Sequence, residues 1–178
     1  MSKGGSGLFN GTNGAKQAET SPKAETKKSK EYTETTSLNN HIVNPEPSDS
    51  GRQGIKGAHH KGNFMSEVER IGAKTIGTTK NSQMDGVEKI SYKMPKKDKT
   101  GAPTGEYQSK THHKTVYDPS VISSNHYIQR GLEAANNAAN HSPTGRLARE
   151  WTGTDNRGVR WHGYCDADGN ITSFYPED

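Results

Sequence analysis

The sequence predicts an α+β domain, because one clear amphipathic helix lies between two groups of strand-like segments. Residues 74–79 and 87–94 have strand character, and the polar turn between them contains an Asp-Gly pair typical of a hairpin. Residues 107–117 alternate enough to form a third strand. Residues 95–105 are rich in Lys, Gly and Pro, so we expect an exposed loop there.

A helix is predicted over about residues 125–140, and a shorter helix or turn over residues 65–71. The longer helix carries one apolar stripe at helical spacing, and its small residues favour close packing against a sheet. The stripe consists of Ile128, Leu132, Ala135 and Ala139. Pro143 and Gly145 end this helix.

A second hairpin is predicted near the end of the chain, with strands at 159–165 and 171–175. Side chains alternate between the two faces of a strand. The alternation predicts that Ile171, Ser173 and Tyr175 share one face, and that Thr172 and Phe174 share the other. A shift of one residue would exchange these two sets.

The chain of 178 residues has room for one domain and a tail. Only 26% of its residues are hydrophobic and the mean hydropathy is −1.10, so the core must be small. Residues 1–36 contain few large apolar side chains, which predicts a flexible tail or linker before a domain at residues 37–178. We expect no membrane-spanning segment, because no window holds about eighteen consecutive apolar residues. A single cysteine, Cys165, excludes an internal disulfide and a cysteine-based zinc site.

Positive charge is concentrated in the middle of the chain. The chain as a whole has a formal net charge of +4, but residues 51–114 alone contain thirteen Lys and Arg against six Asp and Glu. A basic segment of this kind suits a polyanionic partner such as RNA, because lysines beside phosphates release counterions and steer association.

Two histidines flank a glycine- and proline-rich loop within this region. His41 comes after a polar stretch and directly before two apolar residues, and His59 comes after the loop. The two imidazoles are therefore able to lie close together across the loop. Histidine titrates near neutral pH, and a pair therefore supplies one acid and one base for proton transfer without a metal. The alternative interpretation is that both are solvated loop histidines.

These motifs resemble a known family. His41-Ile42 and the segment 57–64, Gly-Ala-His-His-Lys-Gly-Asn-Phe, resemble the two-histidine signature of the EndoU ribonucleases. The segment 173–176, Ser-Phe-Tyr-Pro, resembles the family's C-terminal Thr/Ser-x-Tyr-Pro element. The similarity spans residues 38–178 and is greatest to the bacterial toxin branch, found at the C-terminal ends of contact-dependent growth inhibition toxins.

The resemblance implies a compact fold of two antiparallel β-sheets with flanking helices, similar to pancreatic ribonuclease. It implies His59 as the general base and His41 as the general acid, with His60 as a rival to His59 if the loop register differs. It also implies a lysine that stabilises phosphate charge, for which Lys114 is the candidate. Ser173 and Tyr175 match the hydroxyl and aromatic pair that contacts substrate, and the neighbouring Thr172 leaves that register open. We assign substrate binding to Lys56, His60 and Lys61, and we expect no metal or other cofactor.

By resemblance, the chain is expected to be an antibacterial toxin endoribonuclease that cleaves RNA, with tRNA a natural candidate. Attack by the 2'-hydroxyl would leave 2',3'-cyclic phosphate ends. The expected partners are a cognate acidic immunity protein and a larger delivery protein of which this chain is the C-terminal part. The toxin would be secreted or delivered at the cell surface, and would act in the cytoplasm of the target cell.

Two other classes of function are considered. A metal-dependent nuclease would use the pairs His59-His60 and His112-His113, but adjacent histidines on a strand point to opposite faces, so each pair offers at most one ligand. A non-catalytic RNA-binding or carrier-interaction module would use Trp151 and Trp161 for stacking. Binding that survives loss of both His41 and His59 would identify the second class.

Overall fold

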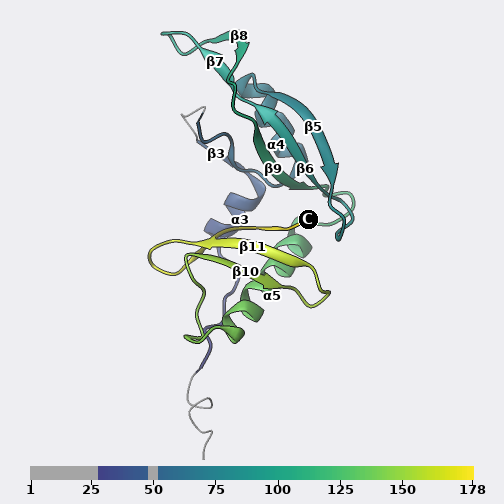
Figure 1. Ribbon diagram of the computed structural model, residues 1–178, viewed down its shortest axis with the longest axis vertical. Helices are drawn as coiled ribbons and strands as arrows, with labels where there is room; N and C mark the ends of the chain where they lie inside the picture. Colours follow the sequence, from purple (N-terminus) through teal and green to yellow (C-terminus); the bar gives the residue numbers. More distant parts are fainter. Residues whose placement is uncertain (1–27, 48–51) are drawn as a thin grey trace, which may run out of the picture.

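The computed structural model describes residues 28–47 and 52–178. These residues form three helices and four small antiparallel sheets, which confirms the α+β class (Figure 1). The helices are α3 (Thr36–Val43), α4 (Lys61–Ile71) and α5 (Ser124–His141). The strands are β3 (Pro45–Glu46), β4 (Lys56–Gly57), β5 (Lys74–Lys80), β6 (Val87–Lys93), β7 (Pro95–Lys97), β8 (Pro103–Tyr107), β9 (His112–Tyr117), β10 (Glu150–Thr154), β11 (Arg160–Cys165) and β12 (Ile171–Pro176). No helix in this described part is long and apolar enough to cross a membrane.

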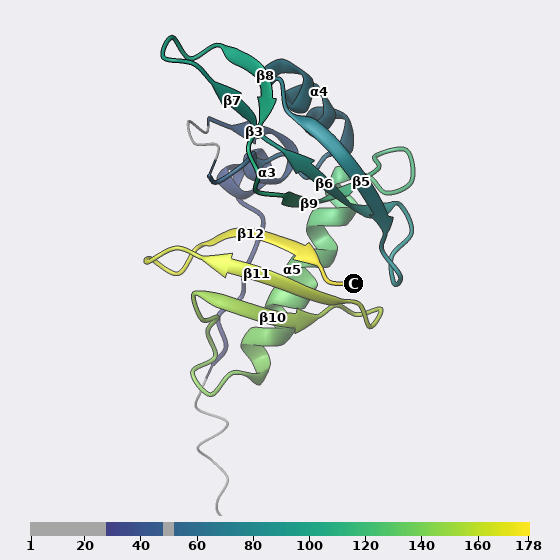
Figure 2. The same ribbon diagram turned by 45° about the horizontal axis from the view of Figure 1, so that its top comes forward.

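One sheet, in the order β10-β11-β12, packs on the long helix α5 (Figures 1 and 2). Ser123 caps the helix by accepting a hydrogen bond from the backbone N–H of His126. All four residues of the predicted apolar stripe are buried, and they contact the aromatic side chains of the sheet. Gly153 allows the closest approach, since a Cβ there would lie 2.1 Å from the carbonyl oxygen of Ala134. The predicted helix and the predicted C-terminal hairpin are therefore confirmed.

The alternation predicted for β12 is wrong at Ile171. Ser173 and Tyr175 do share a face, but Ile171 is buried in the same core as Phe174. The register shows the reason, because Tyr164 pairs with Ser173 whereas Cys165 pairs with Ile171. One extra residue of β12 thus lies in a β-bulge between Ile171 and Ser173. The bulge interrupts the alternation, so Ile171 faces the core rather than the side of Ser173.

The other three-stranded sheet, in the order β5-β6-β9, packs on α4 and has its own core. Phe64 and Val68 of the helix contact Ile90 and Tyr92 of the central strand. Strands β5 and β6 confirm the hairpin that the sequence predicts. The arrangement of two antiparallel sheets with flanking helices is also confirmed, and the two cores meet near the start of β6 and the end of β9, where Val87 and Tyr117 belong to the first core.

The segment between β6 and β9 differs from the prediction. The expected loop at 95–105 contains the hairpin β7–β8, and the strand expected over 107–117 is divided, because β8 ends at Tyr107 and β9 begins only at His112. The hairpin closes through backbone hydrogen bonds around Asp98. Its strands lack alternating apolar side chains, so no pattern in the sequence indicates them.

Part of the segment before the boundary predicted at residue 37 packs on the domain. Residues 1–27 of the expected tail lie outside the described residues, but its described part packs on the domain. The Tyr32 side chain is 7% exposed and belongs to the first core. Its backbone N–H donates to Asn136 Oδ1 at 2.7 Å, and its hydroxyl accepts from the Leu147 N–H at 3.0 Å. The folded domain therefore includes Tyr32, whose single ring supplies the contacts that composition alone did not suggest.

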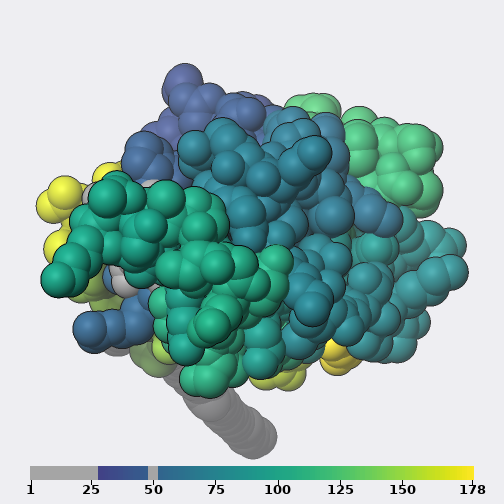
Figure 3. All heavy atoms as spheres, turned by 90° about the horizontal axis from the view of Figure 1, so that it is seen from above, coloured from purple at the N-terminus to yellow at the C-terminus, as the bar shows by residue number. Residues whose placement is uncertain are grey.

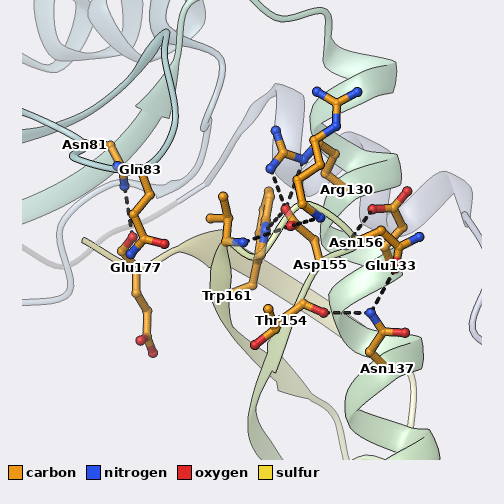
Figure 4. Close-up of polar contacts among 12 residues, drawn as sticks. Asn81, Gln83, Arg130, Glu133, Asn137, Thr154, Asp155, Asn156, Trp161 and Glu177 are labelled. Atoms are coloured by element: carbon orange, nitrogen blue, oxygen red, sulfur yellow. Dashed lines mark hydrogen bonds and ion pairs between the residues drawn. The ribbon is translucent and has the colours of Figure 1, made fainter.

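A buried carboxylate ties the β10–β11 turn to α5 (Figure 4). Oδ2 of Asp155 accepts hydrogen bonds from Arg130 at 2.7 and 2.9 Å and from the Trp161 indole N–H at 2.9 Å. Oδ1 accepts from the backbone N–H groups of Arg157 and Val159. Both charged side chains are buried, so this pair fixes the orientation of the sheet on the helix from within.

Candidate active site

A cleft of about 550 Å³ lies where the two sheets approach each other. Four elements supply most of its polar lining: the end of α3, the loop around β4, strand β9 and strand β12. The lining residues are His41, Gln53, Ile55, Lys56, Gly57, His59, Lys89, Tyr92, His112, His113, Lys114, Thr115, Tyr164, Ser173 and Tyr175.

His41 is positioned by the short helix α3. Thr35 begins this helix by accepting a hydrogen bond from the Leu38 N–H at 3.1 Å. Leu38 and Ile42 are buried, which places His41 in the last turn at the edge of the cleft. The sequence suggested only a short apolar step here, because a helix of eight residues is not stable alone and depends on this packing.

The glycine loop carries His59 to His41 through backbone contacts. The Ala58 N–H donates to the His41 carbonyl at 3.0 Å, and the His59 N–H donates to the Ile42 carbonyl at 2.7 Å. Gly57 has a φ of +71°, and a Cβ there would lie 2.7 Å from the His41 carbonyl oxygen, so only glycine fits. The two imidazole centroids lie 6.0 Å apart. The structure therefore brings together the two histidines that the sequence singles out.

Hydrogen bonds fix which nitrogen of His59 faces the cleft. Its Nδ1 lies 2.7 Å from the Thr115 carbonyl oxygen, which only accepts, so Nδ1 carries the proton. Nε2 is then the free acceptor, 3.5 Å from the Ser173 hydroxyl. His41 Nδ1 lies instead 3.2 Å from a carboxylate oxygen of Glu46, which favours a protonated ring. His59 thus presents an unprotonated nitrogen to the cleft, whereas His41 has a carboxylate beside it that opposes loss of its proton.

The electrostatic surroundings also separate the pKa values of the two histidines, with that of His59 the more strongly lowered. Burial, together with the positive charge of Lys114, lowers the pKa of His59 well below its ordinary value. Burial also lowers the pKa of His41, but the Glu46 carboxylate opposes that effect. His59 therefore remains neutral to lower pH than His41 does, and a pair of groups separated in this way is typical of a base and its acid.

Lys114 lies beside the pair on β9. Its Nζ donates to the Gly57 carbonyl at 2.8 Å. Burial lowers its pKa to about 8, with Glu46 partly opposing the shift. The ammonium group is therefore mostly charged at neutral pH, and it lies close enough to His59 to influence its pKa. A cation in this position suits a phosphate group whose negative charge increases during reaction.

Strand β12 supplies a hydroxyl and an aromatic group to the lining of the same cleft. Ser173 and Tyr175 both line the cleft, whereas Thr172 is exposed and donates to the Tyr164 carbonyl at 3.3 Å. Burial and the neighbouring Tyr164 raise the pKa of Tyr175 to about 12, so its phenol stays neutral. His162 stacks on the Tyr175 ring with centroids 5.5 Å apart and fixes its plane.

Of the three residues assigned to substrate binding, only Lys56 lines the cleft. His60 caps α4, where its Nδ1 accepts from the Asn63 N–H at 3.1 Å. Lys61 forms an ion pair with Glu88 at 3.0 Å. The helix begins directly after His59, and this turns both side chains away from the cleft.

Several residues in or beside the cleft escaped the sequence analysis. Glu46 lies close to His41 in sequence. Its negative charge near a candidate histidine was the one signal that could have identified it. Tyr92 lines the cleft, and its hydroxyl accepts from the Ile55 N–H at 2.8 Å. Tyr164 reaches the site from β11. Only the pairing of strands places these two tyrosines, so no motif indicates them.

The two adjacent histidines on β9 point to opposite faces, as predicted. His112 is buried and stacks on Tyr92 with centroids 5.3 Å apart, whereas His113 is exposed and lies within hydrogen-bonding distance of the Ser91 hydroxyl. Within residues 28–47 and 52–178, no three His, Cys, Asp or Glu side chains are grouped as metal ligands would be.

The fold matches the expectation of an EndoU-like domain, and comparison with known proteins confirms the family. The chain belongs to the bacterial EndoU nuclease family, whose model matches residues 35–178. It is 31% identical over 132 residues, 72% of the chain, to the tRNA nuclease CdiA of Escherichia coli strain STEC_O31. It is 27% identical over 126 residues, 70% of the chain, to the tRNA nuclease CdiA of Yersinia mollaretii. The matched region spans 4% of the length of each relative.

The pKa of Lys114 leads to a prediction about pH. With His41 as the expected general acid, kcat/KM for RNA cleavage should fall as the pH rises above its lowered pKa, because His41 then loses its proton. Above pH 8 the fall should become steeper by about tenfold per pH unit, because Lys114, with a pKa of about 8, becomes neutral. A pH–rate profile of the wild-type protein checks this.

The matched variant is Lys114→Gln, which removes the titrating charge and keeps a polar side chain. Its profile should lack the steeper limb and should lie below that of the wild type at neutral pH. A steeper limb that persists in Lys114→Gln would assign the break to another group.

Proposed function

We propose that this chain is an endoribonuclease that cleaves RNA by general acid–base catalysis with His59 and His41. The observation that carries the proposal is the histidine pair, with centroids 6.0 Å apart, beside the buried Lys114, in which Glu46 opposes the lowering of the pKa of His41. RNA supplies its own nucleophile, the 2'-hydroxyl, so a base, an acid and a cation are the groups that the reaction requires.

In this mechanism Nε2 of His59 takes the proton of the 2'-hydroxyl. The 2'-oxygen then attacks the adjacent phosphorus, and the bond from phosphorus to the 5'-oxygen breaks. His41 gives its proton to the departing 5'-oxygen, while the ammonium group of Lys114 stabilises the charge on the phosphoryl oxygens. The products are a 2',3'-cyclic phosphate and a 5'-hydroxyl. Ser173 and Tyr175 are assigned to contacts with phosphate and with ribose or base.

We further propose that the RNA is tRNA of a target cell and that the chain is the toxic part of a larger delivery protein. The names of the two CdiA relatives support the substrate, and their length supports the larger protein. In this role the toxin is carried at the cell surface or secreted, and acts in the cytoplasm of the cell that receives it.

The test is cleavage of total RNA by the purified chain in EDTA. None of the proposed steps uses a metal, so we expect cleavage to continue at an undiminished rate. The new ends should be 2',3'-cyclic phosphates and 5'-hydroxyls, which end-labelling before and after phosphatase treatment distinguishes. Sequencing of the ends would then show whether tRNA is preferred. Cleavage that stops in EDTA and leaves 5'-phosphates would refute the mechanism.

A cell that makes this nuclease needs protection from it, and we propose a small acidic immunity protein that covers the cleft. The cleft is lined by several basic side chains, including Lys56, Lys89 and Lys114, so an acidic surface complements it. Opposite charges should make the association rate fall as salt increases. Co-expression with the adjacent gene and stopped-flow binding at several salt concentrations test this. A protective partner that leaves the cleft open to a short RNA would contradict it.

A further inference from the structure

Basic side chains extend beyond the cleft across the solvent face of the β5-β6-β9 sheet. Side chains of β6 alternate, so that Ile90 and Tyr92 face the second core while Lys89 and Lys93 face the other way. Lys89 itself lines the cleft. The same sheet face therefore begins at the cleft and leads along β6 to the hairpin β7–β8.

The hairpin carries a cluster of exposed lysines. Lys96, Lys97 and Lys99 are all exposed on it, and Lys110 is exposed where the chain returns to β9. Residues 89–114 contain seven lysines against two carboxylates. In the view from above, the green-teal segment that includes the hairpin lies at the surface (Figure 3).

The two carboxylates do not neutralise this surface. Asp98 is used within its own turn, where it accepts from the backbone and hydroxyl of Thr100. Glu106 lies 3.7 Å from Lys96, and both side chains are more than half exposed, so the pair is weak and solvated. A net positive surface therefore remains along the hairpin.

The hairpin is held in a fixed position relative to the cleft. Met94 and Pro95 are buried at its base, and the Gln108 N–H donates to the Met94 carbonyl at 2.8 Å. No residue from 95 to 107 lines the cleft. These lysines are thus available to a part of a ligand that lies outside the cleft.

We propose that the β7–β8 hairpin is a second RNA-binding surface, which contacts phosphates away from the bond that is cut. This inference rests on the proposed ribonuclease function. A dinucleotide carries a single bridging phosphate and occupies the cleft alone, whereas a long RNA that leaves the cleft along β6 meets Lys96, Lys97 and Lys99. The hairpin then selects long or structured RNA over short fragments, through phosphate contacts that release counterions.

The test variant replaces Lys96, Lys97 and Lys99 by Gln. Against a tRNA-sized RNA at about 0.1 M salt, we expect kcat/KM to fall about tenfold or more, and cleavage of a dinucleotide to stay within about twofold. Binding of the same RNA is measured in a His41→Ala background, which should be inactive. There the slope of log affinity against log salt should become shallower by about one for each lysine that contacts phosphate.

The matched control replaces Lys28, Arg146 and Arg157 by Gln. These side chains are also exposed, and the change in net charge is the same, but they lie outside the hairpin. The control should cleave and bind like the wild type. Equal losses in both variants, or a parallel loss of dinucleotide cleavage in the hairpin variant, would overturn the proposal. Binding is also compared on an RNA of the same length with 2'-deoxy nucleotides, which lacks the 2'-hydroxyl nucleophile, so a failure of the assignment of His41 alone would leave the binding result intact.

Discussion

The variants His59→Ala and His41→Ala should each cleave RNA about 10²-fold or more slowly than the wild type, which is the usual effect of losing a general base or acid. His59 is the larger risk to folding because it is buried, so circular dichroism and thermal unfolding should accompany the kinetics. The matched control is His60→Ala. It removes an adjacent imidazole that caps α4, and should cost about 1 kcal/mol of stability with little change in kcat.

A substrate with a good leaving group separates the two roles. An RNA analogue that carries an aryl phosphate ester in place of the 5'-nucleoside needs no general acid. We therefore expect His41→Ala to recover most of its activity on this analogue, while His59→Ala remains slow. Recovery by His59→Ala instead would exchange the two assignments. Full activity in both variants, or an inactive His60→Ala or His113→Ala protein, would show that the acid and base lie elsewhere.

Asp155→Ala should lower the free energy of unfolding by about 3–5 kcal/mol, because it leaves the buried Arg130 guanidinium without a partner. The measurement is urea unfolding followed by tryptophan fluorescence. Trp161 also loses its hydrogen bond in this variant, so its emission should change even in the folded protein. Adding Arg130→Met to Asp155→Ala should restore part of the stability, since the unpaired charge is then removed.

The surface pair Glu67–Arg70 provides the control, because its nitrogen and oxygen are also 2.7 Å apart and its arginine is exposed. Glu67→Ala should cost about 0.5 kcal/mol or less. Burial raises the pKa of Asp155, but hydrogen bonds from Trp161, the turn backbone and Arg130 outweigh burial and lower it overall. The stability from Asp155 is thus present above its unfolded pKa and lost as the pH falls through the folded pKa. Equal effects of the two alanine variants would contradict a buried structural pair.

Local sequence patterns were sufficient to predict the elements that local interactions determine. The β5–β6 hairpin follows from an Asp-Gly turn between strand-forming segments, and α5 follows from its apolar stripe. The signature residues His41, His59, Ser173 and Tyr175 could be named from sequence because a family motif records them, and all four line one cleft.

Tertiary contacts decided the rest. Helix α3 exists because Leu38 and Ile42 are buried, and Tyr32 joins the core although its neighbours in sequence are polar. His59 and His60 are adjacent and chemically identical, yet the start of α4 sends one into the cleft and makes the other a cap.

The sequence by itself determined which residues are able to carry acid–base chemistry, the two hairpins and the long helix. Only the tertiary structure decided the pKa values of those residues. Burial lowers the pKa values of His59 and Lys114, Lys114 on β9 lowers that of His59 further, and Glu46 on β3 opposes the lowering of the pKa of His41. A pKa depends on the solvent and charges within a few ångströms, and chain segments far apart in sequence create those surroundings here.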